Sequence, residues 1–273
     1  TNILASAKEI ITSTFNDPME IMVTLIIGTF LFLMMSLTAM GQACFQNSFG
    51  GTSLEEIQCV IETTEGNMVF AGRSLSGGSK EMIYVVQTDA TGNLMWSKTY
   101  GDLNNSEMAV SITEGNNGSI LITGYTYSFG NTADCDITLV KLDNSGKLLW
   151  SKVYLGSNNE YGAEVSTTPD GGYYITGSTF STGSGLTDVT LIKTDSNGNM
   201  LWNKTYGGTG LDNASALKTT ADGGAVITGF TMSKGAGNKD VILIRTNAIG
   251  DTLWTRTFGN TLADQAWGVC ISP

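Results

Sequence analysis

Residues Trp202 to Thr231 read WNKTYGGTGLDNASALKTTADGGAVITGFT, and this stretch decides the fold because the chain contains several copies of it. Its opening tryptophan recurs every 52 to 54 residues, at the head of similar phrases such as WSKTYG and WTRTFG. The glycine near its end recurs at the same interval and closes the phrases VFAG, LITG, YITG and VITG. The recurrent residues are Trp96, Trp150, Trp202 and Trp254, with Gly72, Gly124, Gly177 and Gly229. Such self-similarity indicates a repeat architecture.

Each repeat is predicted to form four antiparallel strands. Short runs of β-branched and aromatic residues alternate with turns rich in glycine. In turns such as Asp143–Gly146 and Asp195–Gly198, the Asp side chain opens the turn and Gly takes a positive φ. The Asp-Gly-Gly phrases at 170–172 and 222–224 indicate a second kind of hairpin. In the fourth repeat the predicted strands are Ala214–Thr220, Gly224–Thr231, Asp240–Thr246 and Thr252–Phe258.

Four strands and one large aromatic residue per unit of about 50 residues are typical of a β-propeller blade. A single blade cannot bury both of its faces, so neighbouring blades must stack, and an aromatic side chain suits the layer between them. The sequence therefore predicts an all-β propeller of four-stranded antiparallel blades with a period of about 52. Four full blades span Thr52 to Phe258, and partial strands are predicted at Phe45–Phe49 and Ala266–Ser272. This arrangement predicts an incomplete ring.

The repeat pattern resembles the SBBP-type repeat of bacterial seven-bladed propellers. The matching phrases are W-x-K-x-Y-G-G, D-x-A, T-x-D-G-G-x-x-I-T-G-x-T and D-x-x-L-I-K-x-D-x-x-G. They are carried here by Trp202–Gly208, Asp212–Ala214, Thr220–Thr231 and Asp240–Gly250. The resemblance covers roughly 45–273 and implies a secreted surface protein similar to those of the Bacteroidetes group. It also implies seven blades, so that roughly two to three further units are expected beyond Pro273.

The composition excludes several classes of function. The chain has a net charge of −11, which opposes nucleic acid and anionic membrane surfaces as partners. It has no histidine, which excludes Ser-His-Asp and Cys-His catalysis and imidazole metal sites. Its four cysteines, Cys44, Cys59, Cys135 and Cys270, show no CxxC spacing, which argues against a zinc site and leaves disulfide pairing open.

The segment before the repeats, residues 1–43, is predicted to be an upstream extension followed by a signal peptide or a membrane anchor. Ile21–Met40 is an uncharged, mostly apolar run, which we expect to form one hydrophobic helix. The small residues just before Cys44 suit signal peptidase, whereas about 20 apolar residues also suffice to span a bilayer. Lipid attachment at Cys44 is a further alternative. The propeller repeats, 44–273, are then extracytoplasmic, and the chain meets a membrane only through this segment.

The recurrent acids Asp136, Asp188 and Asp240 are the candidates for a metal site. They precede the third strand in three repeats, so equivalent positions on successive blades would form a ring of carboxylates that binds cations or polar ligands. The structural alternative, which we favour, is that each Asp caps a turn or accepts hydrogen bonds from nearby backbone amides. Met82 stands at this position in the first repeat. No cofactor is predicted, and calcium is the metal that the sequence leaves open.

Two other patterns were weighed as sites. The turn Asp143–Gly146 loosely suggests a calcium loop, but an EF-type loop needs oxygens at alternate positions over about 12 residues. A simple β-turn is therefore predicted. Lys141 and Lys193 each lie two residues before an Asp, on one strand, and could form ion pairs between blades. At a surface such pairs contribute only about 0–1 kcal/mol each.

The sequence carries no GxSxG, P-loop or dinucleotide fingerprint. We therefore expect an exported, non-catalytic propeller that serves as a surface scaffold or binds a protein or a glycan. Acids are plentiful, so a secreted polysaccharide hydrolase or lyase with two carboxylates is the alternative. The loops between second and third strands are rich in Gly, Ser and Thr, which suits polar recognition. These loops are Ser74–Lys80, Tyr127–Cys135, Thr179–Thr187 and Thr231–Lys239.

Overall fold

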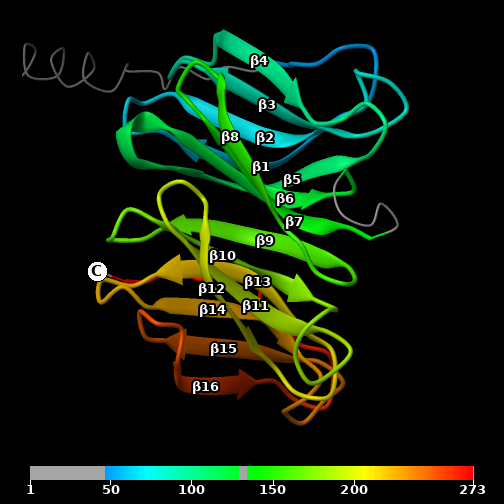
Figure 1. Cartoon of the computed structure of the whole chain (residues 1–273), viewed down its shortest axis with the longest axis vertical. Coiled ribbons are helices and arrows are strands. Elements are labelled where there is room, and N and C mark those ends of the chain that lie inside the picture. The colour runs from blue at the N-terminus through cyan, green and yellow to red at the C-terminus, as the bar shows by residue number, and fades with distance from the viewer. Residues whose placement is uncertain (1–46, 129–133, 273) are drawn as a thin grey trace, which may run out of the picture. The chain divides into compact units, whose positions relative to one another are not determined.

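The computed structural model describes residues 47–128 and 134–272, which form sixteen strands in four sheets (Figure 1). The strands are β1 (Glu55–Glu62), β2 (Met68–Ser74), β3 (Met82–Thr88), β4 (Leu94–Tyr100), β5 (Glu107–Glu114), β6 (Ile120–Thr126), β7 (Asp136–Leu142), β8 (Leu148–Tyr154), β9 (Glu160–Thr167), β10 (Tyr173–Thr179), β11 (Asp188–Thr194), β12 (Met200–Tyr206), β13 (Asp212–Thr219), β14 (Ala225–Thr231), β15 (Asp240–Thr246) and β16 (Thr252–Phe258). Each sheet is an antiparallel meander of four consecutive strands, as predicted for a propeller blade. The described helical structure is one 3-10 turn, Asn116–Gly118.

The strands of the fourth blade follow the predicted bounds closely. β15 and β16 begin and end as predicted. β13 begins two residues earlier than predicted, because its ladder with β14 extends to Asp212, which pairs with Thr231. β14 begins one residue later, at Ala225, because the Gly224 N–H donates to Asp222 Oδ1 inside the turn.

A bulge in the first strand of every blade explains the recurrent glycines. The pairing of β1, β5, β9 and β13 with the second strand skips one residue, and the bulge brings a carbonyl oxygen close to the second strand. A Cβ atom on Gly177 would lie 1.9 Å from the Tyr161 carbonyl oxygen. Gly72, Gly124 and Gly229 would meet the equivalent carbonyl at 1.8 or 1.9 Å. Glycine is required at this position because no side chain fits there.

Apolar side chains of adjacent blades form three cores, one at each blade junction. β3, β6, β7, β10 and β11 are buried along almost their whole length. In the second and third blades this is because a blade packs on each of their faces. Full burial of a large aliphatic side chain stabilises the fold by about 1.5–3 kcal/mol. Central residues of the three cores are Val85 and Ile122, Leu139 and Ile175, and Leu191 and Ile227.

The W-x-K-x-Y phrase forms an outer joint between blades. In β12, Trp202, Lys204 and Tyr206 reach over the turn that connects β15 and β16 in the next blade. The Tyr206 hydroxyl donates to the Gly250 carbonyl at 2.6 Å, and Lys204 forms an ion pair with Asp251. The Trp202 ring covers Gly250 so closely that a Cβ there would lie 2.7 Å from the ring. The recurrent aromatic therefore requires a recurrent glycine in the next blade.

The same joint recurs at the other junctions. Trp96 packs on Gly146 and Trp150 packs on Gly198, which confirms equivalent surroundings for three of the four tryptophans. Trp254 has the same place in β16, but no further blade of the described residues covers it, and 37% of it is exposed. These tryptophans lie at the rim of each junction and are half-buried.

The predicted partial strand Ala266–Ser272 does not form, and residues 47–49 of the predicted strand Phe45–Phe49 are not in a strand either; Phe45 and Gln46 lie outside the described residues. Residues 47–49 and 266–272 have no ladder partners. Asp264 is nevertheless docked as Asp212 is, because its N–H donates to the Lys239 carbonyl at 2.8 Å. Asn47 Nδ2 likewise donates to the Gly92 carbonyl at 2.6 Å. These segments are anchored where a first and a fourth strand would lie, but a ladder also needs the neighbouring strand of the same blade.

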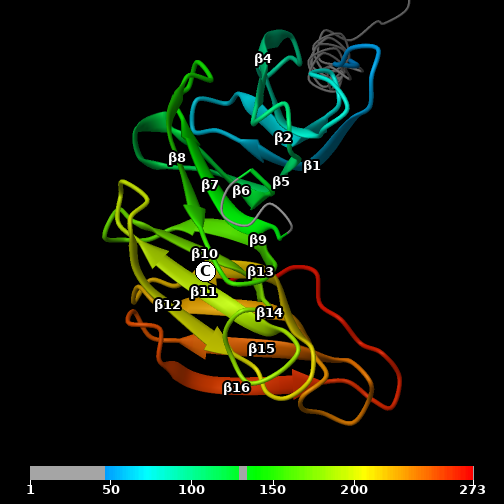
Figure 2. The ribbon, with the colours of Figure 1, turned by 45° about the vertical axis from the view of Figure 1, so that its right-hand side comes forward.

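The four blades follow one another in chain order, with β1–β4 at one end of the stack and β13–β16 at the other (Figure 2). Over the described residues the first and fourth blades lie at opposite ends of the stack. Residues 1–46 are outside the described part, and so are Ile21–Met40 and Cys44, so the domain boundary at residue 43 stays a prediction. Within residues 47–128 and 134–272, no helix is long and apolar enough to cross a bilayer.

Candidate functional site

The structure places the predicted acids Asp136, Asp188 and Asp240 at the first residue of the third strands β7, β11 and β15, where all three are buried. Asp136 Oδ1 accepts a hydrogen bond from the Gly156 N–H at 2.9 Å. Asp188 Oδ2 accepts one from the Ser184 N–H at 2.9 Å. Asp240 Oδ2 accepts one from the Gly237 N–H at 3.0 Å. The three acids thus hold loop amides at one end of their blades.

A second set of acids, which the sequence analysis did not single out, begins the first strands. Glu107, Glu160 and Asp212 are the first residues of β5, β9 and β13, and all are buried. Each accepts hydrogen bonds from hydroxyls at or just after the end of the second strand, as Glu160 does from Thr179 at 3.0 Å and from Ser181. The recurrence of an acid at this position was visible in the repeat alignment, but its burial was not.

The two sets of acids meet across blade junctions. A Cβ on Gly207 would lie 2.0 Å from Asp188 Oδ1 and 2.7 Å from Asp212 Oδ2, so both carboxylates lie around one point. Burial raises the pKa of Asp188, and the negative charge of Asp212 raises it further, against the hydrogen bond from Ser184. Burial also raises the pKa of Glu160, as does neighbouring Asp136. We call Asp136/Glu160 and Asp188/Asp212 the junction pairs.

The first junction differs because Met82 replaces the third-strand acid. Glu107 therefore has no carboxylate opposite it from β3. Its Oε2 accepts the Asp102 N–H at 3.0 Å, and its Oε1 accepts the hydroxyls of Thr126 and Ser128. Burial raises the pKa of Glu107 despite these hydrogen bonds.

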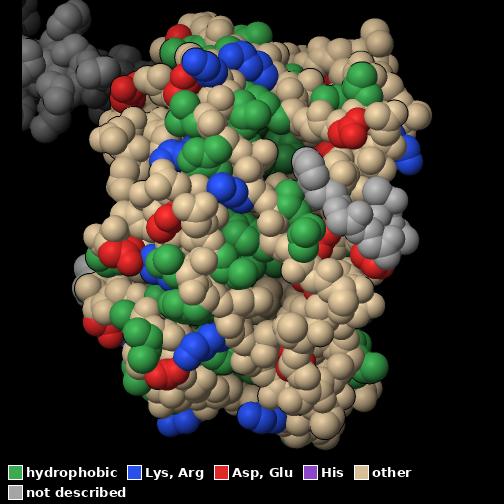
Figure 3. Space-filling view, in the orientation of Figure 1, with side chains coloured by type: hydrophobic (Ala, Val, Ile, Leu, Met, Phe, Trp, Pro, Cys, Tyr) green, Lys and Arg blue, Asp and Glu red, His purple; other side chains and the backbone are tan. Residues whose placement is uncertain are grey.

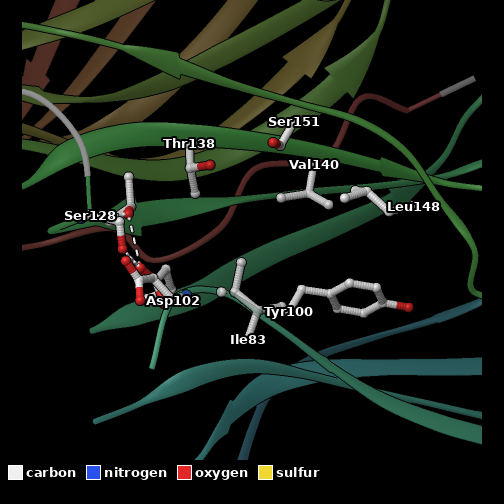
Figure 4. A pocket seen from close by; sticks show the side chains of 11 residues that line it. Ile83, Tyr100, Asp102, Ser128, Thr138, Val140, Leu148 and Ser151 are labelled. Carbon is white, nitrogen blue, oxygen red and sulfur yellow. Dashed lines mark hydrogen bonds between the residues drawn. The ribbon is translucent and has the colours of Figure 1, made fainter. Parts of the chain in front are cut away.

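A cavity of about 220 Å³ lies at this first junction (Figure 4). The Tyr100 ring and Ile83 lie on the first blade, opposite Val140 and Ser151 on the second. Asp102 and Ser128 lie at one end of the cavity and Leu148 lies at the other end. Glu107 lies with Asp102 and Ser128, because it accepts the Asp102 N–H and the Ser128 hydroxyl. The lining therefore combines one aromatic face, aliphatic walls and a cluster of hydrogen-bonding groups.

Equivalent cavities exist at neighbouring positions. One of about 450 Å³ lies beside the first blade, with Glu55 and Ser97 in its lining. One of about 70 Å³ lies between the second and third blades, with Glu160 and Asn203 in its lining. Asn203 occupies the place of Ser151 and accepts a hydrogen bond from the Thr190 hydroxyl at 2.7 Å. The larger side chain of Asn203 accounts for part of the smaller volume.

The lysines considered for ion pairs between blades have other partners. Lys193 pairs with Asp170 of its own blade at 2.9 Å, and Lys141 donates to the Tyr173 hydroxyl of the next blade at 2.9 Å. The ion pair of Lys193 is therefore within its own blade and not between blades, because the hairpin before β10 brings Asp170 to its ammonium. Although partial burial opposes it, hydrogen bonds from Thr168 and Lys193 lower the pKa of Asp170 to about 2.

The turns considered as calcium loops are tight β-turns. Asp143 Oδ1 accepts the N–H groups of Ser145 and Lys147 at 2.9 Å each. These bonds use the carboxylate inside its own turn. Among the described residues no cluster of three or more acids and cysteines has the geometry to hold a metal ion. The described cysteines, Cys59, Cys135 and Cys270, form no disulfide.

Comparison with known proteins finds similarity among solved structures alone. No family model matches the chain, and no curated protein matches it. Among solved structures, the Pan2 WD40 domain of Neurospora crassa has 11% identity over 74% of this chain and 52% of that one, with a TM-score of 0.49. The chain thus spans about half the length of that structure.

Two further structures are similar at the same level. A protein assigned as a gluconolactonase has 12% identity over 79% of this chain and 67% of that one, with a TM-score of 0.46. A Bacteroides caccae protein of unknown function has 11% identity over 78% and 85%, with a TM-score of 0.36. At these values the neighbours say nothing of activity. The four-stranded blades and their repeated joints make the chain an all-β protein of the propeller class.

Proposed function

We propose that this chain is an exported, non-catalytic binding module of propeller fold, and that the cavity at the first blade junction receives a sugar residue of a glycan. The single observation that carries the proposal is the lining of this cavity. The Tyr100 ring offers an apolar face, and Glu107, Asp102 and Ser128 offer acceptors and donors at one end. Sugar rings present the same combination, an apolar face and several hydroxyls.

The size of the cavity supports a small cyclic ligand. Sites for drug-sized molecules occupy about 300–1,000 Å³, whereas this cavity has about 220 Å³. One ring of a longer glycan would enter it, and the rest of the chain would lie on the neighbouring loops. Those loops carry exposed Ser157, Asn158 and Thr182, which suit hydrogen bonding to further hydroxyls.

Protein recognition is the other binding role that the surface supports. Exposed apolar side chains recur at the start of every fourth strand, on four successive blades. Figure 3 shows apolar side chains gathered along the middle of one face, with Lys and Arg beside them. Exposed apolar patches of this kind often mark sites of protein contact. The recurrent side chains are Leu94 and Met95, Leu148 and Leu149, Met200 and Leu201, and Leu253.

We also propose that the chain is exported and that its blades are SBBP-type repeats. These proposals rest on the apolar run Ile21–Met40 and on the repeat phrases. Mass spectrometry of the amino terminus of the natural protein would separate the alternatives. Cleavage before residue 44 supports a signal peptide, and an intact segment upstream of Ile21 supports an anchor.

The test of glycan binding uses one position of the repeat that carries Ser151 in the second blade and Asn203 in the third. Ser151→Asn introduces the residue that stands at the equivalent place in the tighter third blade. We expect this variant to weaken binding to any glycan identified on an array by about tenfold or more. Asn203→Ser is the matched control at the neighbouring junction and should leave binding unchanged. Binding unaffected by Ser151→Asn in a folded variant would contradict the proposed site.

A secreted polysaccharide hydrolase is the second candidate, favoured by one observation. Asp102 and Glu107 line the same cavity, and Glu107 has a raised pKa, as a general acid requires. Reducing-end assays on polysaccharides would test this role. Turnover that disappears in Glu107→Gln while glycan binding persists would establish the hydrolase, and binding without turnover in the unmodified protein would establish the module.

A further inference from the structure

The junction pairs place two buried carboxylates together without a basic partner. Asp136 and Glu160 meet at Gly156 between the second and third blades, because Asp136 accepts the Gly156 N–H and a Cβ on Gly156 would lie 2.1 Å from Glu160 Oε2. Asp188 and Asp212 meet between the third and fourth blades. Of the ion pairs formed by the described residues, none includes one of these four acids. Two like charges in a buried site destabilise each other strongly unless a positive group neutralises them.

Unpartnered oxygen atoms occur in the same pairs. Glu160 Oε2 and Asp212 Oδ1 are buried and have no hydrogen-bond partner in the described structure. Glu160 is 6% exposed and Asp212 is 0% exposed. Buried polar atoms of this kind are rare in folded proteins and call for an explanation.

The first junction provides an internal comparison. There Met82 stands in place of the second acid, and both oxygens of Glu107 accept hydrogen bonds. An unpartnered carboxylate oxygen therefore appears at both junction pairs and not at the first junction, where Met82 replaces the third-strand acid. Asp240 and Asp264 also meet, around Gly259, but Asp264 is only partly buried and neither residue has an unpartnered buried oxygen. The third unpartnered oxygen, on Gln87, belongs to a different part of the first blade. This contrast indicates that the paired acids share a positive ligand.

The donors around the pairs favour a hard cation. They are carboxylate oxygens and the hydroxyls of Ser181 and Ser233. The Cys135 thiol beside the first pair donates to the Glu160 carbonyl oxygen at 3.7 Å, and burial raises its pKa, which disfavours a thiolate ligand. A cavity of about 70 Å³ beside Glu160 leaves room for an ion with a water molecule. Calcium accepts six to eight oxygen ligands in flexible geometry, whereas magnesium demands a near-ideal octahedron.

The geometry points to calcium binding at the two junction pairs. Each ion would be held by the third-strand Asp of one blade and the first-strand acid of the next. It would link adjacent blades directly, at the opposite end of the blade face from the tryptophan joint. This inference does not depend on the proposed glycan site, because the latter lies at the first junction.

The test measures calcium binding to the full chain after metal removal with a chelator. We expect calorimetric titration with calcium chloride to show two sites, with Kd values on the order of 10⁻⁴–10⁻³ M, as in extracellular calcium modules. Calcium at about 10 mM should raise the melting temperature by about 2–8 °C. If calcium gives no binding heat and leaves the melting temperature unchanged, the inference is overturned. That result would mean that protonation of one acid, and not a metal ion, neutralises each pair.

Charge-removing variants locate the sites. Asp136→Asn and Asp188→Asn keep the shape of the side chain, and each should reduce the stoichiometry by one. In chelator both variants should melt at or above the temperature of the unmodified protein, because one of two repelling charges is gone. Asp143→Asn, which removes the same charge from an exposed turn, is the control and should leave both sites intact. Unchanged stoichiometry in Asp136→Asn and Asp188→Asn would overturn the assignment.

Discussion

At the scale of single residues, the repeat is explained by contacts that permit one side chain only. The second-strand glycines face a carbonyl oxygen of the bulged first strand, and the turn glycines lie beneath a tryptophan ring of the preceding blade. The turn glycines Gly146, Gly198 and Gly250 also have positive φ values between 74° and 79°. At these turn positions there is no room for a Cβ atom beneath the tryptophan ring, and the backbone has a positive φ; glycine satisfies both requirements.

Gly177→Ala tests the steric demand. The new methyl group would lie 1.9 Å from the Tyr161 carbonyl oxygen, which is backbone and has little freedom to move. We expect the free energy of unfolding to fall by about 1–3 kcal/mol or more, as for overpacked sites. Gly268→Ala is the control, because nothing lies within 4 Å of its Cβ position. Equal stability of the two variants in urea unfolding would show that the bulge relaxes to accept a side chain.

Asp222 provides a test of pH dependence. The Thr220 hydroxyl, followed by the Arg245 guanidinium and the Gly224 N–H, lowers the pKa of Asp222 to about 2 from its ordinary value of 3.8. A lowered pKa in the folded state means that the stabilisation is present above pH 3.8 and is lost as the pH falls toward 2. Asp222→Asn should therefore be less stable than the unmodified protein at pH 5. The gap should narrow between pH 4 and pH 2, as followed by urea unfolding, and a constant gap would contradict this role.

At the scale of elements, much of the blade follows from the sequence. Both ends of β15 were predicted correctly from its β-branched residues and from the turn residues that follow it, because these sequence signals are local. The strand predicted at 266–272 was wrong, and residues 47–49 form no strand, because a strand exists only with a neighbour to pair with. The junction pairs were missed for a similar reason. Asp188 and Asp212 belong to different blades and come together only when the blades pack, so the local sequence around either residue does not predict their contact.

The tryptophan joint gives a prediction at this scale. Trp202→Ala should lower the free energy of unfolding by about 2–3 kcal/mol, below the 3–5 kcal/mol of a fully buried aromatic, because the ring is half-buried. Trp254→Ala removes the same residue from β16, where no described blade covers it, and should cost less than about 1 kcal/mol. Chemical unfolding of both variants checks the difference. A similar loss in both would mean that the ring acts within its own blade.

At the scale of the whole described array, the protection of backbone amides from hydrogen exchange should depend on where a strand lies in the stack of blades. β10 and β11 are buried on both faces, whereas β1 and β16 are largely exposed. We expect hydrogen exchange of backbone amides to be slowest in β6, β10 and β11 and fastest in β1 and β16, by about tenfold or more. Mass spectrometry of peptides after exchange would show this gradient. Uniform protection across the four blades would indicate that the array opens only as a whole.

The tryptophan joint also bears on how such a chain can change over generations. Every joint uses the same three side chains on one unit and the same glycine turn on the next. Duplication or loss of one repeat-length gene segment therefore leaves each remaining joint with both of its halves. Variation in length by whole repeats would preserve the fold without compensating substitutions, so that the size of the array could evolve separately from the loops that meet a ligand.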